Sequence, residues 1–292
     1  MTSSRDLRWT CGDVALAPGE RPLLMGILNV TPDSFSDGGR YDDPERAAEH
    51  GLRLAEDGAD IVDVGGESTR PGAAAVPVEE ELRRVIPVVA RLAGRTQAVI
   101  SVDTSKAAVA RAAIAAGARI INDVTALGGD PGMAAVARET GAGVILMHMQ
   151  GTPRTMQAAP RYADVVAEVR AYLAARLGEL TAAGIRRACL AVDPGIGFGK
   201  TAEHNLQWLS RLDEIASLDA PVLVGLSRKS FLGAITGRPA PERLAGTLAA
   251  LAVCVLRGAH VLRVHDVKEA RDALEVTLAL QRAARRPTDR GE

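Results

Sequence analysis

LLMGILNVTPDSFSDGG, residues 23–39, is the stretch that decides the fold. A short apolar run, 23–28, leads directly into a loop of Asn, Thr, Asp, Ser and Gly. The run is typical of a buried strand, whereas the loop offers hydrogen-bonding groups and backbone freedom instead of packing surface. The same change from apolar run to polar cluster recurs along the whole chain, which indicates a repeated architecture.

Eight segments have the composition of short strands bounded by Gly, Pro or polar residues. They are 23–30, 60–66, 98–104, 119–124, 143–149, 189–194, 221–227 and 260–266. Most are continuously apolar, which is typical of parallel strands buried on both faces. Ala-rich amphipathic segments lie between them; residues 78–94, for example, carry one apolar stripe and have acids in the first turn.

Eight strand-then-helix units predict an α/β fold, a TIM (β/α)8 barrel with a short N-terminal hairpin or cap. A doubly wound open sheet is the alternative, but it usually has fewer units and a G-x-G-x-x-G turn after its first strand, which is not found here. We expect a single domain over residues 1–292. Its cap would span about 1–20, its barrel about 21–283 and a frayed tail about 284–292.

Composition argues against several classes of function. The 35 Lys and Arg residues balance 36 Asp and Glu residues, and aromatic residues make up only 3% of the chain. Neither a basic field nor stacking platforms for nucleic acid are therefore expected. The N-terminus lacks an apolar signal segment, no apolar run is long enough to span a bilayer, and the three cysteines are far apart. We expect a cytoplasmic protein with free thiols that binds neither nucleic acid nor membrane.

Each predicted strand ends in hydrogen-bonding or charged residues. In a barrel these ends meet at one rim, where active sites lie. One Asn or Asp at a strand end is an ordinary turn residue, but eight such ends around one mouth predict a small-molecule site. The rim residues are Asn29, Glu67 to Arg70, Asp103, Asn122, Asp123, His148, Gln150, Asp193, Ser227 to Lys229, Arg263 and His265.

One group of rim residues is suited to a flat polar heterocycle. Asp103 and Asp193 can accept hydrogen bonds from ring N–H and amino groups, Asn122 can donate and accept, and Lys229 can donate to a ring oxygen or nitrogen.

A second group of rim residues, Thr69, Arg70, Arg263 and His265, is suited to phosphate oxygens. Asn29 is a neutral oxygen ligand of the kind that Mg²⁺ accepts while it keeps most of its waters. A heterocycle, an oligophosphate and Mg²⁺ together suggest displacement of pyrophosphate.

Several candidates have a structural explanation instead. Asp123 follows a strand and is expected to cap the next helix, while His148 is compatible with a rim histidine whose hydrogen bonds are satisfied within the protein. Residues 193–200, DPGIGFGK, end like a phosphate-binding loop, but Pro194 replaces the first glycine, so the match fails. We expect the glycines of this segment to let the backbone pass close to a ligand.

Eight motifs occur in a characteristic order along most of the chain, from about residue 23 to about 270. They are MGILNVTPDSFSDGG (25–39), GADIVDVGGESTRPGA (58–73), SVDTSK (101–106), INDV (121–124), MHMQGTP (147–153), DPGIGFGK (193–200), GLSRKSFLG (225–233) and RVHDV (263–267). In this order they resemble the motifs of the dihydropteroate synthase family, the folate-pathway enzymes that sulfonamides inhibit. One departure is Ile196, where many relatives have Phe, and it lies beside the expected pocket.

The resemblance implies a homodimeric TIM-barrel transferase of the folate pathway. Its substrates would be 6-hydroxymethyl-7,8-dihydropterin diphosphate and 4-aminobenzoate, and its products 7,8-dihydropteroate and pyrophosphate, with Mg²⁺ as cofactor. Pyrophosphate would leave before the amine attacks. The loops 29–39 and 67–73 would close over the site, and we expect the first of them to be mobile without substrate.

The resemblance also implies a role for each matching residue. The pterin would contact Asp103, Asn122, Met147, Asp193, Gly225 and Lys229. The diphosphate would contact Asn122, Arg263 and His265, with Asn29 as the Mg²⁺ ligand. The aminobenzoate would contact Phe35, Thr69, Arg70, Pro71, Phe198 and Ser230. The catalytic residues would be Asp103, Arg70, Lys229 and Asp193.

Two other functions remain as alternatives. A pterin-binding methyltransferase would share the Asp and Asn pocket but would not need the 29–39 loop or the S-R-K-S and R-V-H anion set. A duplicated copy that binds ligand without turnover would be expected to lose a loop or pocket residue, and none is missing from the sequence.

Overall fold

The computed structural model describes residues 7–19, 21–31, 44–69 and 72–284. Its centre is a ring of eight parallel strands. They are β3 (Leu23–Asn29), β4 (Ile61–Gly65), β5 (Val99–Asp103), β6 (Ile120–Asp123), β7 (Gly143–Met147), β8 (Leu190–Asp193), β9 (Leu223–Val224) and β10 (Val261–Val264). Each falls inside a segment that the sequence predicts as a strand.

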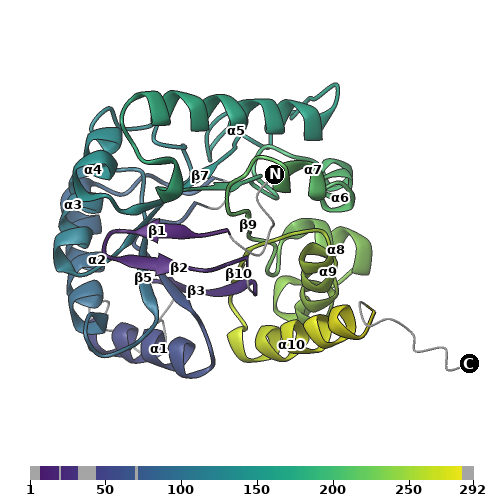
Figure 1. Cartoon of the computed structure of the whole chain (residues 1–292), viewed down its shortest axis with the longest axis horizontal. Coiled ribbons are helices and arrows are strands. Elements are labelled where there is room, and N and C mark those ends of the chain that lie inside the picture. The colour runs from purple at the N-terminus through teal and green to yellow at the C-terminus, as the bar shows by residue number, and fades with distance from the viewer. Residues whose placement is uncertain (1–6, 20, 32–43, 70–71, 285–292) are drawn as a thin grey trace, which may run out of the picture.

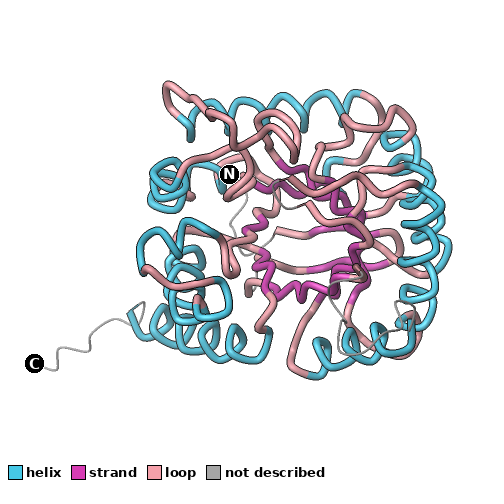
Figure 2. Tube along the Cα trace, turned by 180° about the vertical axis from the view of Figure 1, so that it is seen from behind, coloured by secondary structure: helices cyan, strands magenta, loops and turns pink. Residues whose placement is uncertain are grey.

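The strands close into a barrel, as Figure 2 shows. Hydrogen-bonded neighbours follow the order β8-β7-β6-β5-β4-β3-β10-β9. A parallel bridge between Val192 and Val222 joins the two ends of this order, and the amide of Val192 donates to the carbonyl of Pro221 at 2.8 Å. The predicted TIM barrel is therefore confirmed, and the open-sheet alternative is wrong.

Helices form the outer layer of the barrel (Figure 1). They are α1 (Pro44–Glu56), α2 (Val78–Leu92), α3 (Ala107–Ala116), α4 (Met133–Thr140), α5 (Val165–Ala182), α6 (Ala202–Ser210), α7 (Asp213–Ala216), α8 (Ser230–Thr236), α9 (Leu244–Leu256) and α10 (Val267–Ala284). Local chemistry sets several helix ends. The Asp164 side chain accepts from the amides of Val166 and Ala167 at the start of α5, and Gly141 ends α4 with a left-handed φ of 64°.

Two apolar cores hold the layers together. The larger core lies between the outward faces of the strands and the helices. The smaller core lies inside the barrel, near the start of the strands, and includes Met25, Ile61, Ile120 and Ile145. Because side chains alternate along a strand, the residues that continue this inward row toward the strand ends face the mouth of the barrel.

The N-terminal hairpin covers the end of the barrel at which the strands begin (Figure 1). Its antiparallel strands are β1 (Trp9–Cys11) and β2 (Val14–Leu16). Trp9 is fully buried in the inner core, and its indole N–H donates to the carbonyl of Cys189 at 2.9 Å. The predicted hairpin or cap is therefore present and closes the barrel opposite its catalytic rim.

Cys11, Cys189 and Cys254 are free and buried. Within the described part of the chain, no helix is long and apolar enough to cross a membrane.

Truncation of Trp9 should separate stability from ligand binding. We expect Trp9→Ala to lower the free energy of unfolding by roughly 3–5 kcal/mol, because it leaves a cavity in the inner core. Urea denaturation measures this change, and a calorimetric titration with a pterin should show unchanged affinity because the hairpin lies at the other end of the barrel. Trp9→Phe, which keeps most of the apolar volume, is the control. A large loss of pterin affinity in a folded Trp9→Ala protein would contradict the expectation that the hairpin does not affect ligand binding at the other end of the barrel.

Candidate active site

Four adjacent strands bring rim residues into one row. Across the sheet, Asn29 pairs with Gly65, Gly65 with Asp103, and Asp103 with Asn122. Gly65 has no side chain, and a Cβ there would lie 3.4 Å from the Cβ of Asp103. Gly65 therefore lets the Asp103 side chain lie against the backbone of β4, and the row ends at the C-terminal edge where barrel enzymes bind ligands.

A hydrogen-bonded ion-pair network lies directly below this row. Arg263 on β10 donates to Asp63 at 2.7 Å through Nε and to Asp103 at 2.8 Å through a terminal nitrogen. The side-chain amide of Asn122 also donates to Asp63, at 3.0 Å. Asp63 is fully buried, and its second oxygen has no hydrogen-bond partner among the described residues. One carboxylate in the barrel interior therefore orients both an arginine and an amide toward the mouth.

The ionisation of this network is set by burial and by its neighbours. Burial raises the pKa of Asp103 to about 7 against the opposing charge of Arg263, and the nearby carboxylates Asp63, Glu81 and Asp123 add to the increase. Burial works against the charge of Arg263, but the carboxylates around it still raise the pKa of this guanidinium above its ordinary value. Arg263 therefore stays charged, whereas Asp103 titrates near neutral pH.

On the opposite side of the mouth, Asp193 and Lys229 form a second polar pair. Asp193 ends β8 and accepts from the amide of Gly195 at 2.7 Å, and its burial raises its pKa. Lys229 donates to the carbonyl of Ile196, and its nitrogen lies 4.2 Å from the centre of the Phe198 ring. Burial lowers the pKa of Lys229 to about 8, with Asp193 opposing this change and Arg263 adding to it.

The mouth therefore holds a balanced set of buried and half-buried charges. Three carboxylates and three cations from different strands and loops converge there, namely Asp63, Asp103, Asp193, Lys200, Lys229 and Arg263. Balanced charges allow ionised groups to remain at a site with little water, ready to hydrogen-bond a polar ring.

The other sequence-predicted contacts occupy the same rim. Met147 ends β7 and is buried, while Gly225 directly follows β9. His265 follows β10, and its Nδ1 lies 3.0 Å from the hydroxyl of Ser227. Their roles toward substrate stay predictions, but their positions agree with them.

The predicted aminobenzoate residues are only partly within the described chain. Phe35, Arg70 and Pro71 lie outside the described residues, as does most of the 29–39 loop. Thr69 and Phe198 are half-buried beside the rim, and Ser230 is exposed at the start of α8.

Two expectations from the sequence can be compared directly with the structure. Asp123 accepts from the amides of Thr125 and Leu127 at 2.8 and 3.0 Å, so its structural interpretation holds, although it orders a loop and not a helix start. The glycines of residues 193–200 allow a close approach to other parts of the protein, and their approach to a ligand stays a prediction. A Cβ at Gly195 would lie 2.0 Å from the carbonyl oxygen of His148.

Asp63 and Lys200 are the site residues that sequence reasoning missed. Asp63 stands inside the apolar run IVDVG, so a carboxylate in the middle of a buried strand was the available signal. Lys200 ends a segment whose phosphate-loop pattern fails at Pro194. Neither residue is at a strand end, where polar residues of a barrel point to a site.

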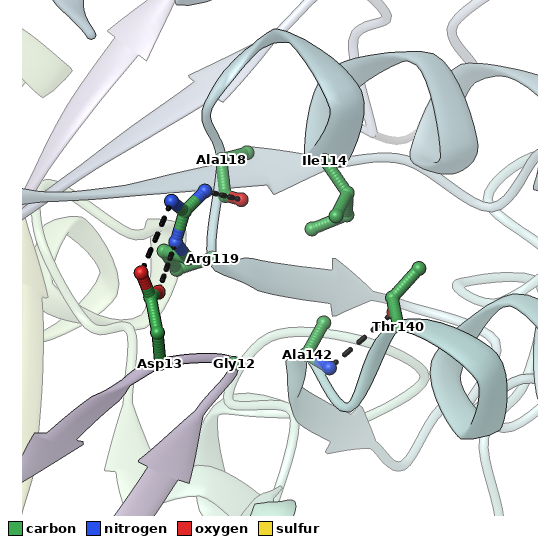
Figure 3. A pocket seen from close by; sticks show the side chains of 7 residues that line it. All are labelled: Gly12, Asp13, Ile114, Ala118, Arg119, Thr140 and Ala142. Atoms are coloured by element: carbon green, nitrogen blue, oxygen red, sulfur yellow. Dashed lines mark hydrogen bonds and ion pairs between the residues drawn. The ribbon is translucent and has the colours of Figure 1, made fainter.

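A pocket elsewhere on the molecule is separate from this site (Figure 3). It has a volume of about 250 Å³ and lies at the hairpin end of the barrel. Figure 3 shows Asp13 and Arg119 pointing toward each other across it, in an ion pair. The other residues that line it are Gly12, Ile114, Ala118, Thr140 and Ala142. Because it faces away from the rim, it contains none of the predicted site residues.

Comparisons with known proteins identify the family. The model of the pterin binding enzyme family matches residues 25–265. A dihydropteroate synthase of Escherichia coli K12 is 52% identical over 258 residues, which cover 88% of this chain and 91% of the relative. The chain belongs to the dihydropteroate synthase family.

Solved structures of this family have the same fold. A Xanthomonas albilineans dihydropteroate synthase with 4-aminobenzoic acid superposes with a TM-score of 0.89 at 52% identity, covering 94% of this chain and 98% of that one. The same enzyme in complex with 7,8-dihydropteroate gives a TM-score of 0.85 at 49% identity, with the same coverage. The resemblance of the eight motifs to this family is therefore confirmed.

Substitution of Asp63 tests whether it organises the mouth. We expect Asp63→Asn to weaken pterin binding roughly tenfold, since a charge-assisted hydrogen bond contributes about 1.5–3 kcal/mol and this carboxylate positions both Arg263 and Asn122. Calorimetric titration with a pterin measures the change. Asp60→Asn is a matched control, because Asp60 also accepts from an arginine, Arg271 at 3.0 Å, but does so at the other end of β4. Equal affinity in both variants would show that Asp63 does not position the site.

The pKa of Asp103 predicts how pterin binding depends on pH. Only the ionised carboxylate accepts through both oxygens, so affinity for a pterin without diphosphate should fall as the pH decreases through about 7. Because the folded-state pKa is raised above its ordinary value, Asp103 favours folding most at low pH and loses this contribution as the pH rises through about 7. Titrations across this window should show the inflection near pH 7 in the wild type, and Asp103→Asn should keep only the acidic limb that Asp193 contributes. An affinity that stays constant in the wild type would refute the assignment.

Proposed function

We propose that this chain joins 6-hydroxymethyl-7,8-dihydropterin diphosphate to 4-aminobenzoate, giving 7,8-dihydropteroate and pyrophosphate. The observation that carries the proposal is the balanced cluster of carboxylates, lysines and arginine at the C-terminal mouth of the barrel. In a member of this family, the cluster stands where the two-substrate site is expected. The rest of this proposal assigns roles to the members of that cluster that would contact the substrates.

The pterin is proposed to bind between the two halves of the mouth. Asp103 and Asp193 accept from its N–H and amino groups, while Asn122 and Lys229 complete the hydrogen bonds at its other edge. Both carboxylates are nearly buried, with 8% and 7% of their surfaces exposed. Their negative charge is therefore weakly screened and stabilises positive charge on the ring.

The diphosphate is proposed to lie at the rim beside Arg263 and His265. Arg263 bonds two carboxylates in the structure, so it belongs physically to the pterin half as well as to the anion set. This arrangement links the two halves of the substrate through one guanidinium. Arg263 would then interact electrostatically both with the departing pyrophosphate and with the charge on the pterin ring.

Mg²⁺ is proposed to bind beside Asn29. Among the described residues, no group of three or more His, Cys, Asp or Glu side chains is placed to hold a metal ion. A single amide at the strand end beside Gly65 fits an ion that keeps its waters and is held mainly by substrate phosphates. When bound, Mg²⁺ would neutralise charge on the departing diphosphate.

The residues of the mouth favour a dissociative reaction. Loss of pyrophosphate leaves a cation that is delocalised into the pterin ring, and the aromatic amine is a neutral nucleophile that then attacks. The reaction therefore requires no strong general base. His148, which lies beside the mouth, is a weak base because its pKa is low. Burial lowers the pKa of His148 to about 3, with Lys200 adding to the effect, so this imidazole is neutral at working pH. Water exclusion protects the cation, and the loops 29–39 and 67–73 are proposed to provide it.

A homodimer in the cytoplasm is the proposed working form. Four large apolar side chains are exposed on the adjacent helices α9 and α10, namely Val253, Leu256, Val276 and Leu280. Exposed apolar residues on neighbouring helices support an interface between copies. The buried free thiols support a reducing compartment.

A single assay tests the proposed reaction. Purified protein, the pterin diphosphate, 4-aminobenzoate and Mg²⁺ are mixed, and pyrophosphate is measured as it is released. We expect release that depends on 4-aminobenzoate and is inhibited by a sulfonamide. Release without the amine, or none at all, would contradict the transferase proposal. Methyl transfer from methyltetrahydrofolate would instead support the methyltransferase alternative.

A further inference from the structure

Lys200 is a buried lysine that the proposed reaction does not use, and burial lowers its pKa to about 7 against the opposing charge of Asp193. It directly follows the loop 194–199 after β8 and is only 2% exposed. Its ammonium group lies 3.0 Å from the carbonyl oxygen of Gly195, 3.1 Å from that of Phe198 and 3.0 Å from Nδ1 of His148. An ammonium has three N–H donors, so these three acceptors satisfy it completely.

The composition of the chain gives a second reason to examine this lysine. Of the 35 Lys and Arg residues, only four are lysines, at positions 106, 200, 229 and 268. The chain uses arginine for most of its positive charges, and at position 200 it has a lysine, whose compact ammonium group reaches three acceptors inside the protein. The longer, planar guanidinium of arginine does not match this arrangement.

The loop held by Lys200 carries several contacts of the mouth. Its carbonyl at Ile196 accepts from Lys229, and its Phe198 ring lies under the same ammonium. At its start, the Gly195 amide donates to Asp193. Loss of the Lys200 contacts would release the two carbonyls that fix the ends of this loop.

A side chain from α6 and one from the loop before α5 fix the middle of the segment. Asn205 accepts from the amide of Gly197 at 2.8 Å, and Gln157 donates to its carbonyl at 2.7 Å. Gly195 is also close to the backbone of His148, whose ring bonds Lys200. The loop is thus held from three sides, and Lys200 is its charged support.

We propose that Lys200 is a positioning residue for the transferase site: it holds the loop 194–199 so that Asp193, Phe198 and Lys229 meet the pterin and the aminobenzoate in one geometry. Lys200 itself does not contact substrate. The inference rests on the proposed function for its substrates, but pterin binding tests it without turnover.

Lys200 also acts on Asp193 through its charge. The pKa of Asp193 is raised by burial, and the opposing influences are its bond from Gly195 and the positive charges of Lys229, Lys200 and Arg263. Removal of the Lys200 charge therefore raises the pKa of Asp193 further, and a higher pH is needed to ionise it. A residue that served only packing would not change this pH dependence.

Two variants separate the hydrogen bonds from the charge. Lys200→Met keeps the length of the side chain but removes both, whereas Lys200→Gln keeps N–H donors without the charge. We expect Lys200→Met to raise the dissociation constant of a pterin at least tenfold, the loss typical of removing a charged donor from buried acceptors. Lys200→Gln should recover part of this affinity. In both variants the acidic limb of pterin binding should move to higher pH.

The controls address folding and the choice of residue. Thermal unfolding and near-UV circular dichroism check that each variant is folded. If Lys200→Met does not fold, Lys200→Gln, which keeps N–H donors, is used in its place. Lys268→Met is the matched lysine control, because Lys268 is exposed on α10, and it should bind pterin as the wild type does. Folded Lys200 variants with wild-type affinity and an unshifted pH profile would overturn the proposal. Wild-type protein that binds pterin without releasing pyrophosphate would instead count against the proposed reaction alone.

Discussion

The guanidinium of Arg263 lies between the carboxylates of Asp63 and Asp103, and the arrangement of the mouth depends on this constraint. A buried cation is tolerated only when carboxylates surround it, and each carboxylate is tolerated only because the cation is present. Asp63 also accepts a hydrogen bond from the side-chain amide of Asn122 and so fixes its orientation. Strands β4, β5 and β6 are thereby linked by ion pairs and a hydrogen bond to each other and to β10, which is far away in the sequence.

The two ends of the barrel solve different physical problems. At the hairpin end, Trp9 and the inner apolar core remove hydrocarbon from water, which stabilises the fold without directional demands. At the rim, the same inward-facing positions carry charges, which cost desolvation energy and must be matched in geometry. Inside the barrel, apolar packing lies at the hairpin end and charged groups lie at the rim, a division that lets the rim hold groups with shifted pKa values.

Much of the fold could be predicted because each strand is a short apolar run that a polar cluster ends. Periodicity and turn residues are local, and eight repeats of them specify a barrel. The rim candidates could be predicted for the same reason, since Asp103, Asn122 and Asp193 each stand at a strand end. Asp63 and Lys200 could not be found in this way, because one lies within a strand and the other beyond a loop. Their importance comes from partners distant in sequence, Arg263 for the first and His148 for the second.

The sequence by itself determined the order of elements, the closed barrel and, through its motifs, the family. It also placed the chemistry at the strand ends, because parallel strands must deliver those ends to one rim. Only the tertiary structure decided which charges meet there. Arg263, which the sequence predicts beside phosphate, also lies between two carboxylates, since β10 pairs with β3 and faces its inward side chains toward those of β4 and β5. No local stretch of residues determines the distances across a closed ring of strands. The pairing of buried charges therefore depends on the closed barrel and cannot be derived from local sequence patterns.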